Sequence, residues 1–449
     1  MNTKKRICVI GAGPSGMSTL YHFANKMGSG MDIELVCYEK QNDWGGLWNY
    51  SWRTGTDEYG ELCHNGMYTN LFTNGAKEFH EYPDYTFEDH FKKAIPSFPP
   101  RTVIRDYFEG RWTQKGKANL KKYIKFNNVV RHVCYDDVKS QFTVEAYDLV
   151  DNKTTTEAFS HVLVAIGIFN CPKVPSIDGI ESFKGRVMHS HDFRNASDFR
   201  DQRVLVIGSS YSAEDISIQC LKFGAKSIIC TWKNKAMGFK WPKGIEERPL
   251  VQKFVGNCAT FKDGSRAEFD TVIFCTGYHY AFPFMEDKLR LTSDVSFYPD
   301  NLYKGVLWVN GGDNKLFYVG VQNQYFSFTM FDVQAVWVFM YINGKIKKKS
   351  RGEMQKDIQK WVQRLPKLDT CDKAIDFQTE YMAELIKDTG YPEKAVNSGK
   401  LMHDWIAHKN DNILTYKDQC HASNWTGTVA PKPKVPMYEA FDDSIGAFI

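Results

Sequence analysis

The chain alternates short apolar runs with glycine-containing turns and stretches of helical periodicity, and this alternation is clearest at its beginning. Ile7–Ile10 and Ile33–Tyr38 are apolar runs that predict strands, and Met17–Met27 between them has the pattern of a helix. This order predicts a βαβ unit, in which the two strands lie parallel in one sheet. The chain is therefore expected to begin with a domain of the α/β class.

The same pattern restarts at Arg203. Val204–Ile207 and Ser227–Trp232 predict strands, and Ala213–Phe223 predicts the helix between them. A length of 449 residues accommodates two domains. The predicted fold class is α/β, with two Rossmann-like dinucleotide-binding domains, the second inserted into the first.

The limits of the inserted domain are expected where proline and glycine interrupt the regular pattern. Pro172–Pro175 and Phe274–Tyr278 mark the crossings into and out of it. Residues 171–280 then form the inserted domain, and residues 1–170 and 281–449 form the domain around it.

The remaining segments carry weaker signals. Phe142–Ala146 and Val162–Ile166 predict further strands. Trp44–Tyr85 is rich in Trp, Tyr, Gly and Asn without a clean period, which indicates long functional loops. Gly344–Pro392 is basic and helical in character and is expected on the solvated surface, and Val429–Met437 is expected to be an extended tail.

The turn after the first predicted strand has the spacing of a phosphate-binding loop. Gly11, Gly13 and Gly16 fit GxGxxG, which provides a tight turn, a close approach of the backbone to a pyrophosphate, and close packing of helix on strand. Glu39 follows the second strand, where a carboxylate accepts hydrogen bonds from a ribose 2′-hydroxyl and repels a 2′-phosphate. This site is predicted to bind FAD or NAD rather than NADP; the alternative is a glycine turn in an unrelated α/β fold.

The corresponding turn of the second unit differs in sequence and in charge. After Gly208, Ser210 and Ala213 stand where the pattern has its second and third glycines; alanine is an accepted variant, and serine holds a pyrophosphate slightly further away. Lys233 follows the next strand, where the first unit has Glu39, and a cation there pairs with a 2′-phosphate. The second site is therefore predicted to bind NADPH, although a lone lysine at such a place is otherwise a solvated surface residue.

Composition and charge exclude several classes of protein but indicate no further binding site. The net charge of +4 gives no reason to expect nucleic acid or an anionic membrane as partner. The polar start Met1–Arg6 predicts no secretory signal, and no apolar run is long enough to span a bilayer. We expect a reducing cytoplasm, no disulfide framework and no metal, because the 11 cysteines include no CxxC and no metal-ligand spacing. Four of them lie in apolar runs and are expected to be buried: Cys8, Cys37, Cys230 and Cys275.

A longer motif precedes the second βαβ unit. Phe183–Phe193 fits FxGxxxHxxxF, with His189 at the histidine position. Further stretches match the same family: Glu39–Gly46, Thr73–Glu78, Gly208–Asp215, Met237–Pro242 and Phe274–Tyr278. On these motifs the chain resembles the flavin-containing monooxygenases over nearly its whole length, and most closely their bacterial trimethylamine monooxygenase group.

Three positions qualify this resemblance. The bacterial group usually has arginine where this chain has Lys233; since arginine binds a phosphate with two parallel hydrogen bonds, a weaker preference for NADPH over NADH is expected here. Many relatives have threonine where this chain has Ile166, which we expect to pack without a functional role. Phe193 separates the motif from that of the Baeyer–Villiger monooxygenases, which ends in tryptophan, and no early CxxC supports a disulfide reductase.

The resemblance implies chemistry carried by FAD, NADPH and O2. NADPH would reduce the flavin, O2 would add at C4a to give a hydroperoxide, and an amine or sulfide would take its distal oxygen. The implied reaction is N-oxygenation of trimethylamine to trimethylamine N-oxide, extended to other small tertiary amines and sulfides. Such a protein has to keep the site dry rather than supply an acid–base pair, and the sequence contains no nucleophile–His–Asp pattern.

The resemblance also assigns residues. Asn74 is expected beside the reactive ring and the substrate, Tyr211 over the flavin in gating or hydride-step positioning, and Trp405 in the substrate wall. Residues expected to bind FAD are Gly11, Gly13, Ser15, Gly16, Glu39, Lys40, Gly46, Leu47, Trp48, Met67, Leu71, Thr73, Val130 and Gln322. Residues expected to bind NADP are Ser209, Ser210, Tyr211, Ser212, Lys233, Asn234 and Thr276.

Without the resemblance, several of these residues have plainer interpretations. Asn74 is an ordinary turn residue and Tyr211 a surface aromatic. The loop Phe326–Asp332 resembles a stretch near the far side of the flavin. Three residues are expected to line the FAD cavity and are otherwise core residues: Trp44, Trp48 and Met67.

Two other functions stay open at the level of sequence. One is a broader sulfide or Baeyer–Villiger oxygenase, which product analysis with dimethyl sulfide or a cyclic ketone separates. The other is a flavin-bearing redox sensor without productive oxygen transfer. A homodimer agrees with the family, but no periodic apolar stripe in the sequence indicates an interface.

Overall fold

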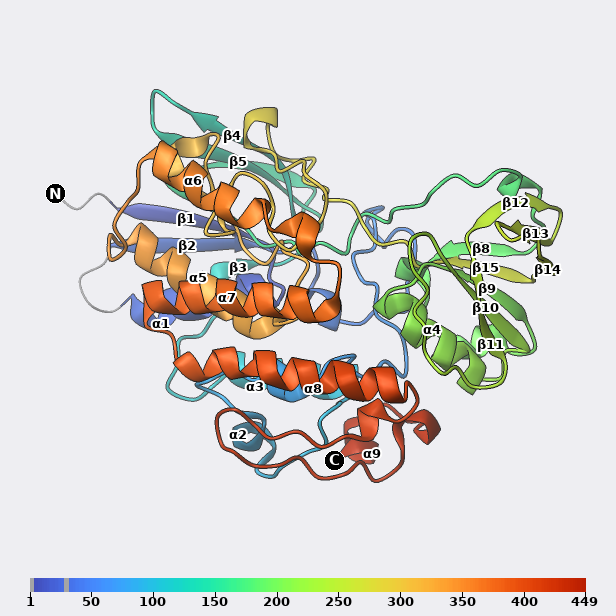
Figure 1. Cartoon of the computed structure of the whole chain (residues 1–449). Coiled ribbons are helices and arrows are strands. Elements are labelled where there is room, and N and C mark those ends of the chain that lie inside the picture. Colours follow the sequence, from blue (N-terminus) through green and yellow to red (C-terminus); the bar gives the residue numbers. More distant parts are fainter. Residues whose placement is uncertain (1–3, 28–31) are drawn as a thin grey trace.

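The computed structural model describes residues 4–27 and 32–449, so Met1–Thr3 of the polar start lie outside it. Figure 1 shows a larger lobe, which contains both ends of the chain, and a smaller lobe formed by a segment from the middle of the chain. A seven-stranded sheet forms the centre of the larger lobe, and a five-stranded sheet forms the centre of the smaller one. The α/β class with two Rossmann-like units is therefore confirmed.

The central sheet of the larger lobe combines strands from both ends of the chain. Its order is β16-β17-β18-β7-β1-β2-β3, and β1 pairs in parallel with β2 and β7. The strands are β1 (Lys5–Ile10), β2 (Ile33–Tyr38), β3 (Ile124–Lys125), β7 (His161–Val164), β16 (Leu302–Tyr303), β17 (Leu307–Trp308) and β18 (Leu316–Tyr318). Because the central strands are covered on both faces, they are apolar almost throughout.

Helices cover one face of this sheet and a strand meander covers the other (Figure 1). The larger lobe contains the helices α1 (Pro14–Lys26), α2 (Phe87–Phe91), α3 (Arg101–Trp112), α5 (Ser327–Ile342), α6 (Arg351–Val362), α7 (Cys371–Thr389), α8 (Ser398–Asp411) and α9 (Ile445–Phe448), of which α2, α8 and α9 lie further from the sheet (Figure 1). The antiparallel meander consists of β4 (Asn128–Asp136), β5 (Gln141–Asp148) and β6 (Lys153–Phe159). In β1, Ile7 and Val9 pack toward the helices, while Cys8 and Ile10 pack toward the meander, as the alternation of side chains along a strand requires.

The smaller lobe has a parallel sheet of order β11-β10-β9-β15-β8 with α4 (Tyr211–Lys222) packed on it. Its strands are β8 (Arg186–His189), β9 (Arg203–Ile207), β10 (Ser227–Trp232), β11 (Ile245–Pro249) and β15 (Thr271–Phe274). A second, antiparallel sheet contains β12 (Val251–Val255), β13 (Cys258–Phe261) and β14 (Arg266–Glu268).

The two segments that join the lobes run side by side. Pro172 and Tyr278 form an antiparallel bridge, and the Lys173 N–H donates to the Gly277 carbonyl at 2.9 Å. The histidine of the FxGxxxHxxxF motif belongs to this junction, because His189 Nε2 lies 3.1 Å from the same Gly277 carbonyl oxygen. The motif therefore ties the edge strand β8 to the connection between the lobes.

Several predicted elements have the observed bounds, and others need correction. Ile33–Tyr38 and Ser227–Trp232 are strands as predicted, whereas the first helix begins at Pro14, since proline is favoured in the first turn. The prediction of a merely solvated surface for Gly344–Pro392 is wrong, because α7 buries one apolar face with Phe377 and Tyr381. The four cysteines predicted to be buried are buried.

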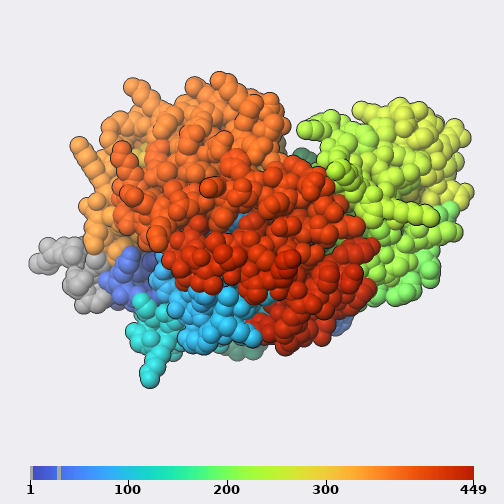
Figure 2. Space-filling model, turned by 60° about the horizontal axis from the view of Figure 1, so that its bottom comes forward, coloured from blue at the N-terminus to red at the C-terminus, as the bar shows by residue number. Residues whose placement is uncertain are grey.

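The C-terminal segment packs against the smaller lobe. In Figure 2 its red surface borders the green surface of the smaller lobe, and the ammonium of Lys222 on α4 donates to the Met437 carbonyl at 3.1 Å. Of the predicted tail Val429–Met437, residues 429–436 contain no helix or strand, whereas Met437 is buried and begins a short 3-10 helix, Met437–Glu439. Within the described residues, no helix has both the length and the apolar character needed to cross a bilayer.

Candidate active site

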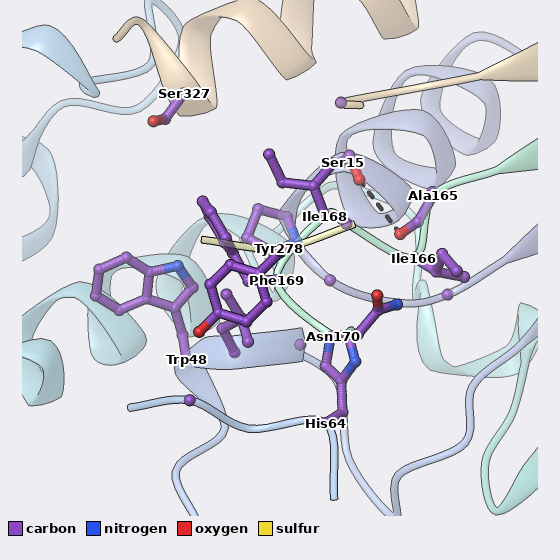
Figure 3. Close-up of a pocket in the computed structure, with 18 of the residues that line it drawn as sticks. Ser15, Trp48, His64, Ala165, Ile166, Ile168, Phe169, Asn170, Tyr278 and Ser327 are labelled. Atoms are coloured by element: carbon purple, nitrogen blue, oxygen red, sulfur yellow. Dashed lines mark hydrogen bonds between the residues drawn. The ribbon is translucent and has the colours of Figure 1, made fainter. Parts of the chain in front are cut away.

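A large cavity of about 1280 Å³ joins the two Rossmann-like units. It is lined by the turn after β1 and by the turn after β9, at the carboxyl ends of the parallel strands of both sheets, where α/β folds bind ligands. Figure 3 shows that Ile166, Ile168, Phe169 and Asn170, which follow β7, run along it. The rings of Phe169 and Tyr278 pack edge to face at 5.3 Å, and together they line the cavity at the junction of the lobes.

The first turn accepts only glycine at two positions. Gly11 has φ +100°, and a Cβ there would lie 2.7 Å from the Ala165 carbonyl oxygen. At Gly16, a Cβ would lie 1.9 Å from the Gly11 carbonyl oxygen. No side chain caps the N-terminus of α1, and its first turn has no acidic residue. Its backbone N–H groups are therefore available to a pyrophosphate, as a dinucleotide requires.

Glu39 is buried at the end of β2 and faces the same cavity. Its carboxylate accepts hydrogen bonds from the Ala12 N–H at 2.6 Å and the Gln41 N–H at 2.8 Å. Burial raises the pKa of Glu39, and these two backbone donors partly oppose that rise. Each carboxylate oxygen keeps a free lone pair for the hydroxyls of a ribose, so the residues present fit a dinucleotide without a 2′-phosphate.

The second turn is more exposed to solvent than the first, although its first position also requires glycine. Gly208 has φ +140°, and a Cβ there would lie 2.1 Å from the Cys275 carbonyl oxygen. Ser209, Ser210 and Ser212 are exposed, and Ser210 makes no side-chain cap for α4. The free N–H groups at the start of α4 therefore fit a second pyrophosphate, consistent with a nucleotide that approaches from solvent.

Glu214 in the first turn of α4 would oppose an anion if it were unpaired, but Lys409 of α8 neutralises it. Lys409 Nζ lies 2.7 Å from Glu214 Oε2, and only 4% of the lysine side chain is exposed. The neighbouring Asp215 pairs in the same way with Lys417, at 2.8 Å. Both pairs join the smaller lobe to the C-terminal part of the chain.

Most of the predicted cofactor residues line the cavity. On the FAD side these are Gly11, Gly13, Ser15, Glu39, Lys40, Gly46, Leu47, Trp48, Met67, Leu71, Thr73, Val130 and Gln322; on the NADP side they are Ser210, Tyr211, Ser212 and Thr276. Figure 3 shows Ser15 beside the first turn, where its hydroxyl donates to the Ala165 carbonyl at 3.4 Å. Gly16 lies behind the turn, where it allows the helix to approach the strand.

Other predicted residues lie outside the cavity lining. Lys233 and Asn234 are exposed just after β10, and Ser209 is exposed beside the second turn. The expectation that Trp44 lines the cavity is wrong: Trp44 is buried in the core against Trp112, and its indole N–H donates to Glu109 at 2.6 Å.

The predicted loop Phe326–Asp332 is helical instead, because α5 begins at Ser327. Ser327 and Phe328 on its first turn line the cavity, and Figure 3 shows Ser327 at the start of this helix. The other end of the predicted loop lies in the core, where the buried carboxylate of Asp332 pairs with the guanidinium of Arg111 at an N–O distance of 3.0 Å.

Asn74, Tyr211 and Trp405 all line the cavity, although they are far apart in sequence. The rings of Tyr211 and Trp405 stack at 6.0 Å, and Tyr325 stands perpendicular to Tyr211 at 6.3 Å. Burial raises the pKa of Tyr211 far above its ordinary value, so its phenol remains neutral. The ammonium of Lys409 lies 4.3 Å from the centre of the Tyr211 ring, and this cation–π interaction helps to hold the ring in place.

His64 and His80 also line the cavity, and no sequence pattern indicated either of them. Burial lowers the pKa of His64 to about 3 and that of His80 to about 4, so both rings are neutral near pH 7. Among the described residues, the Nδ1 atom of His80 is buried without a hydrogen-bond partner. Tyr325, Lys409 and Lys417 were also not predicted from the sequence. The two lysines could have been expected from the neighbouring acids Glu214 and Asp215, because buried carboxylates need cations as partners.

Comparisons with known proteins agree with this geometry. A family model described as flavin-binding monooxygenase-like matches residues 4–238 and 243–391. The chain is 47% identical to the trimethylamine monooxygenase of Pelagibacter ubique and covers 99% of both chains. It is also 47% identical to the trimethylamine monooxygenase of Methylocella silvestris, covering 99% of this chain and 98% of the relative.

The similarity extends to the three-dimensional structure. The crystal structure of Tmm from Pelagibacter sp. strain HTCC7211 superposes with a TM-score of 0.93 at 45% identity, covering 99% of this chain and 100% of that one. The two glycine turns, the buried acid of the first and the motif at the junction thus occur in a chain matched over nearly its full length. The chain therefore belongs to the flavin-binding monooxygenase-like family.

Proposed function

We propose that this protein uses NADPH and O2 to N-oxygenate trimethylamine to trimethylamine N-oxide, and that other small tertiary amines and sulfides are also substrates. The main observation in its favour is the cavity that joins two nucleotide turns of different sequence and charge. Tyr211 and Trp405, which stack on each other, form an aromatic wall of this cavity. The relatives named as trimethylamine monooxygenases supply the substrate.

The two cofactors are assigned to the two lobes. FAD belongs to residues 1–170 and 281–449, whose first turn is paired with the buried acid Glu39. NADPH belongs to residues 171–280, where the exposed turn leads to Lys233. The division into a seven-stranded and a five-stranded sheet supports this assignment.

FAD, when bound, supplies two-electron redox chemistry with NADPH and activates O2. The chain has to hold the nicotinamide near the flavin, exclude water, and admit a small amine. Trp48, Phe328 and Tyr325 provide apolar wall on the cavity, and water excluded there does not compete with the amine. Asn74 also lines the cavity, and its side-chain amide offers hydrogen-bond donors.

The aromatic wall suits a small amine in both of its charge states. Trp405 and Tyr325 attract a trimethylammonium ion through their ring faces. Only the free amine has the lone pair that accepts oxygen, so turnover is expected to rise toward alkaline pH. A flat profile of turnover between about pH 6 and 9 would count against this order of events.

The test is NADPH oxidation by the purified flavoprotein in aerated buffer, with and without trimethylamine, together with an assay of the N-oxide. Amine-stimulated oxidation with one N-oxide per NADPH supports the proposal. Slow oxidation that yields peroxide alone contradicts it. A broader sulfide or Baeyer–Villiger oxygenase is the second candidate, and dimethyl sulfide or a cyclic ketone would then be the better substrate.

We further propose a homodimer in the cytoplasm. The family resemblance favours the dimer, and the absence of any CxxC among the 11 cysteines favours a reducing compartment. Light scattering of the purified protein tests the first point, and fractionation of cells tests the second.

A further inference from the structure

The ammonium group of Lys417 has three hydrogen-bond acceptors around it, one for each N–H. Nζ lies 2.8 Å from Asp215 Oδ1, 3.2 Å from the Phe72 carbonyl oxygen and 3.4 Å from Asn74 Oδ1. Only 10% of the lysine side chain is exposed. Since the three donors are matched and solvent has little access, the position of this ammonium group is fixed.

The contact with Asn74 determines which way the Asn74 amide faces. A lysine ammonium has donors and no acceptor, so the amide oxygen has to face Lys417. The Nδ2 group is then the part of the amide that remains for the cavity, which Asn74 lines. Within residues 4–27 and 32–449, no side chain or backbone carbonyl accepts a hydrogen bond from Nδ2.

Lys417 is itself held from the smaller lobe. Asp215 lies on α4, and its second carboxylate oxygen accepts a hydrogen bond from the Tyr68 hydroxyl. The Tyr68 ring packs edge to face against Phe193, the last residue of the FxGxxxHxxxF motif, at 5.0 Å. A continuous set of contacts therefore runs from the motif through Tyr68, Asp215 and Lys417 to Asn74.

We propose that Lys417, held by Asp215, is a positioning residue that orients the Asn74 amide so that its NH2 group faces the reacting atoms. This inference rests on the proposed role of Asn74 in oxygen transfer. Lys417 does not itself line the cavity, so it acts only through Asn74. Its loss leaves the amide free to rotate, and oxygen transfer is affected more than flavin reduction.

A spectroscopic test reads the orientation of Asn74 without any substrate. The holoenzyme is labelled with 15N-asparagine, and the side-chain NH2 signal of Asn74 is assigned by its absence in Asn74→Asp. The signal is expected to move in Lys417→Met, which removes the ammonium and keeps the chain length. Lys222→Met is the matched control, because Lys222 also ties α4 to the C-terminal segment but does not contact Asn74.

A kinetic test separates positioning from folding. In Lys417→Met, the N-oxide formed per NADPH oxidised is expected to fall about tenfold while the rate of flavin reduction stays near that of the wild type. Lys417→Arg keeps a cation and its donors, so it should restore part of the coupling. The double variant Lys417→Met/Asp215→Asn leaves no unpaired buried charge and provides a folded form if the single variant is unstable.

The outcomes are distinct. A shifted Asn74 signal with lost coupling in Lys417→Met, and neither change in Lys222→Met, supports the inference. An unmoved signal in Lys417→Met, or equal changes in both variants, overturns it. If the wild type forms no N-oxide but the signal still moves in Lys417→Met alone, the orientation holds and the proposed function fails.

Discussion

The two nucleotide turns have the same backbone plan but opposite surroundings. The first has glycine at all three pattern positions, and the buried carboxylate of Glu39 stands beside it. The second has exposed serines at its turn and an exposed cation, Lys233, after the next strand. The sign of the charge therefore differs, and so does the access of solvent.

This difference explains why one fold serves two roles. An enclosed turn that accepts no larger residue at Gly11 or Gly16 suits a cofactor that stays bound through many turnovers. An open turn suits a nucleotide that enters, donates its electrons and leaves. The comparison predicts that changes at the first turn reduce the amount of bound flavin, while changes at the second alter only the response to NADPH.

The largest effect is expected from Gly16→Ala. The added Cβ would lie 1.9 Å from the Gly11 carbonyl oxygen, so helix and turn have to separate. We expect the purified variant to retain less than about a tenth of the wild-type flavin, measured by its visible absorbance per protein. Gly352→Ala is the control: no atom lies within 4 Å of a Cβ there, and the variant should keep its flavin. Equal flavin contents in both variants would contradict the account of the first turn.

The next effect is expected from Lys233→Glu. Reversing the charge after β10 should raise the KM for NADPH about tenfold, leave that for NADH nearly unchanged, and leave the bound flavin intact. Lys235→Glu makes the same change of charge two residues away, at another exposed position. If the Lys235 variant weakens NADPH use as strongly as the Lys233 variant, the effect comes from the overall charge of this surface rather than from a contact between Lys233 and the 2′-phosphate.

A smaller effect is expected from Lys233→Arg, which sharpens the same comparison. Arginine binds a phosphate with two parallel hydrogen bonds, whereas lysine acts as a point charge. The ratio of kcat/KM for NADPH to that for NADH should rise about threefold. A fall in this ratio would show that the 2′-phosphate is bound elsewhere.

The smallest effect concerns the C-terminal helices that border the second site. Burial lowers the pKa of His403 on α8, but its hydrogen bonds to Asp372 and Asp376 on α7 outweigh this and leave the pKa raised. Because the folded-state pKa is raised, the stabilisation is complete below the unfolded value of about 6.5 and disappears as the pH rises through the folded-state pKa. The difference in Tm between the wild type and His403→Gln should therefore be larger at about pH 6 than at about pH 8.5. A difference in Tm that increases with pH would contradict a raised pKa of His403 in the folded state.

The sequence predicted the parts of the fold and site that depend on local pattern. Strand, turn and helix around Gly11 and Gly208 were readable because glycine spacing and apolar periodicity are local properties. Glu39 followed from its place after the second strand and lines the cavity, whereas Lys233, named on the same ground, lies outside the cavity lining and its role stays a prediction. The family resemblance, rather than any local pattern, indicated Asn74 and Tyr211.

What the sequence did not predict depends on contacts between distant segments. Lys417 meets Asn74 across 343 positions, and Lys409 meets Glu214 across 195. Trp44 was misjudged because its place in the core is decided by Trp112 on α3, which no local pattern reveals. The helical start at Ser327 was missed since no side chain caps this end of α5.

The most direct test of the central claim is a single turnover. The flavin of the holoenzyme is reduced anaerobically with one equivalent of NADPH, and the protein is then mixed with aerated buffer containing trimethylamine. The account predicts about one trimethylamine N-oxide per flavin and little free peroxide. Reoxidation that releases peroxide without N-oxide would show that the two sites serve an oxidase or a sensor, and would contradict the claim.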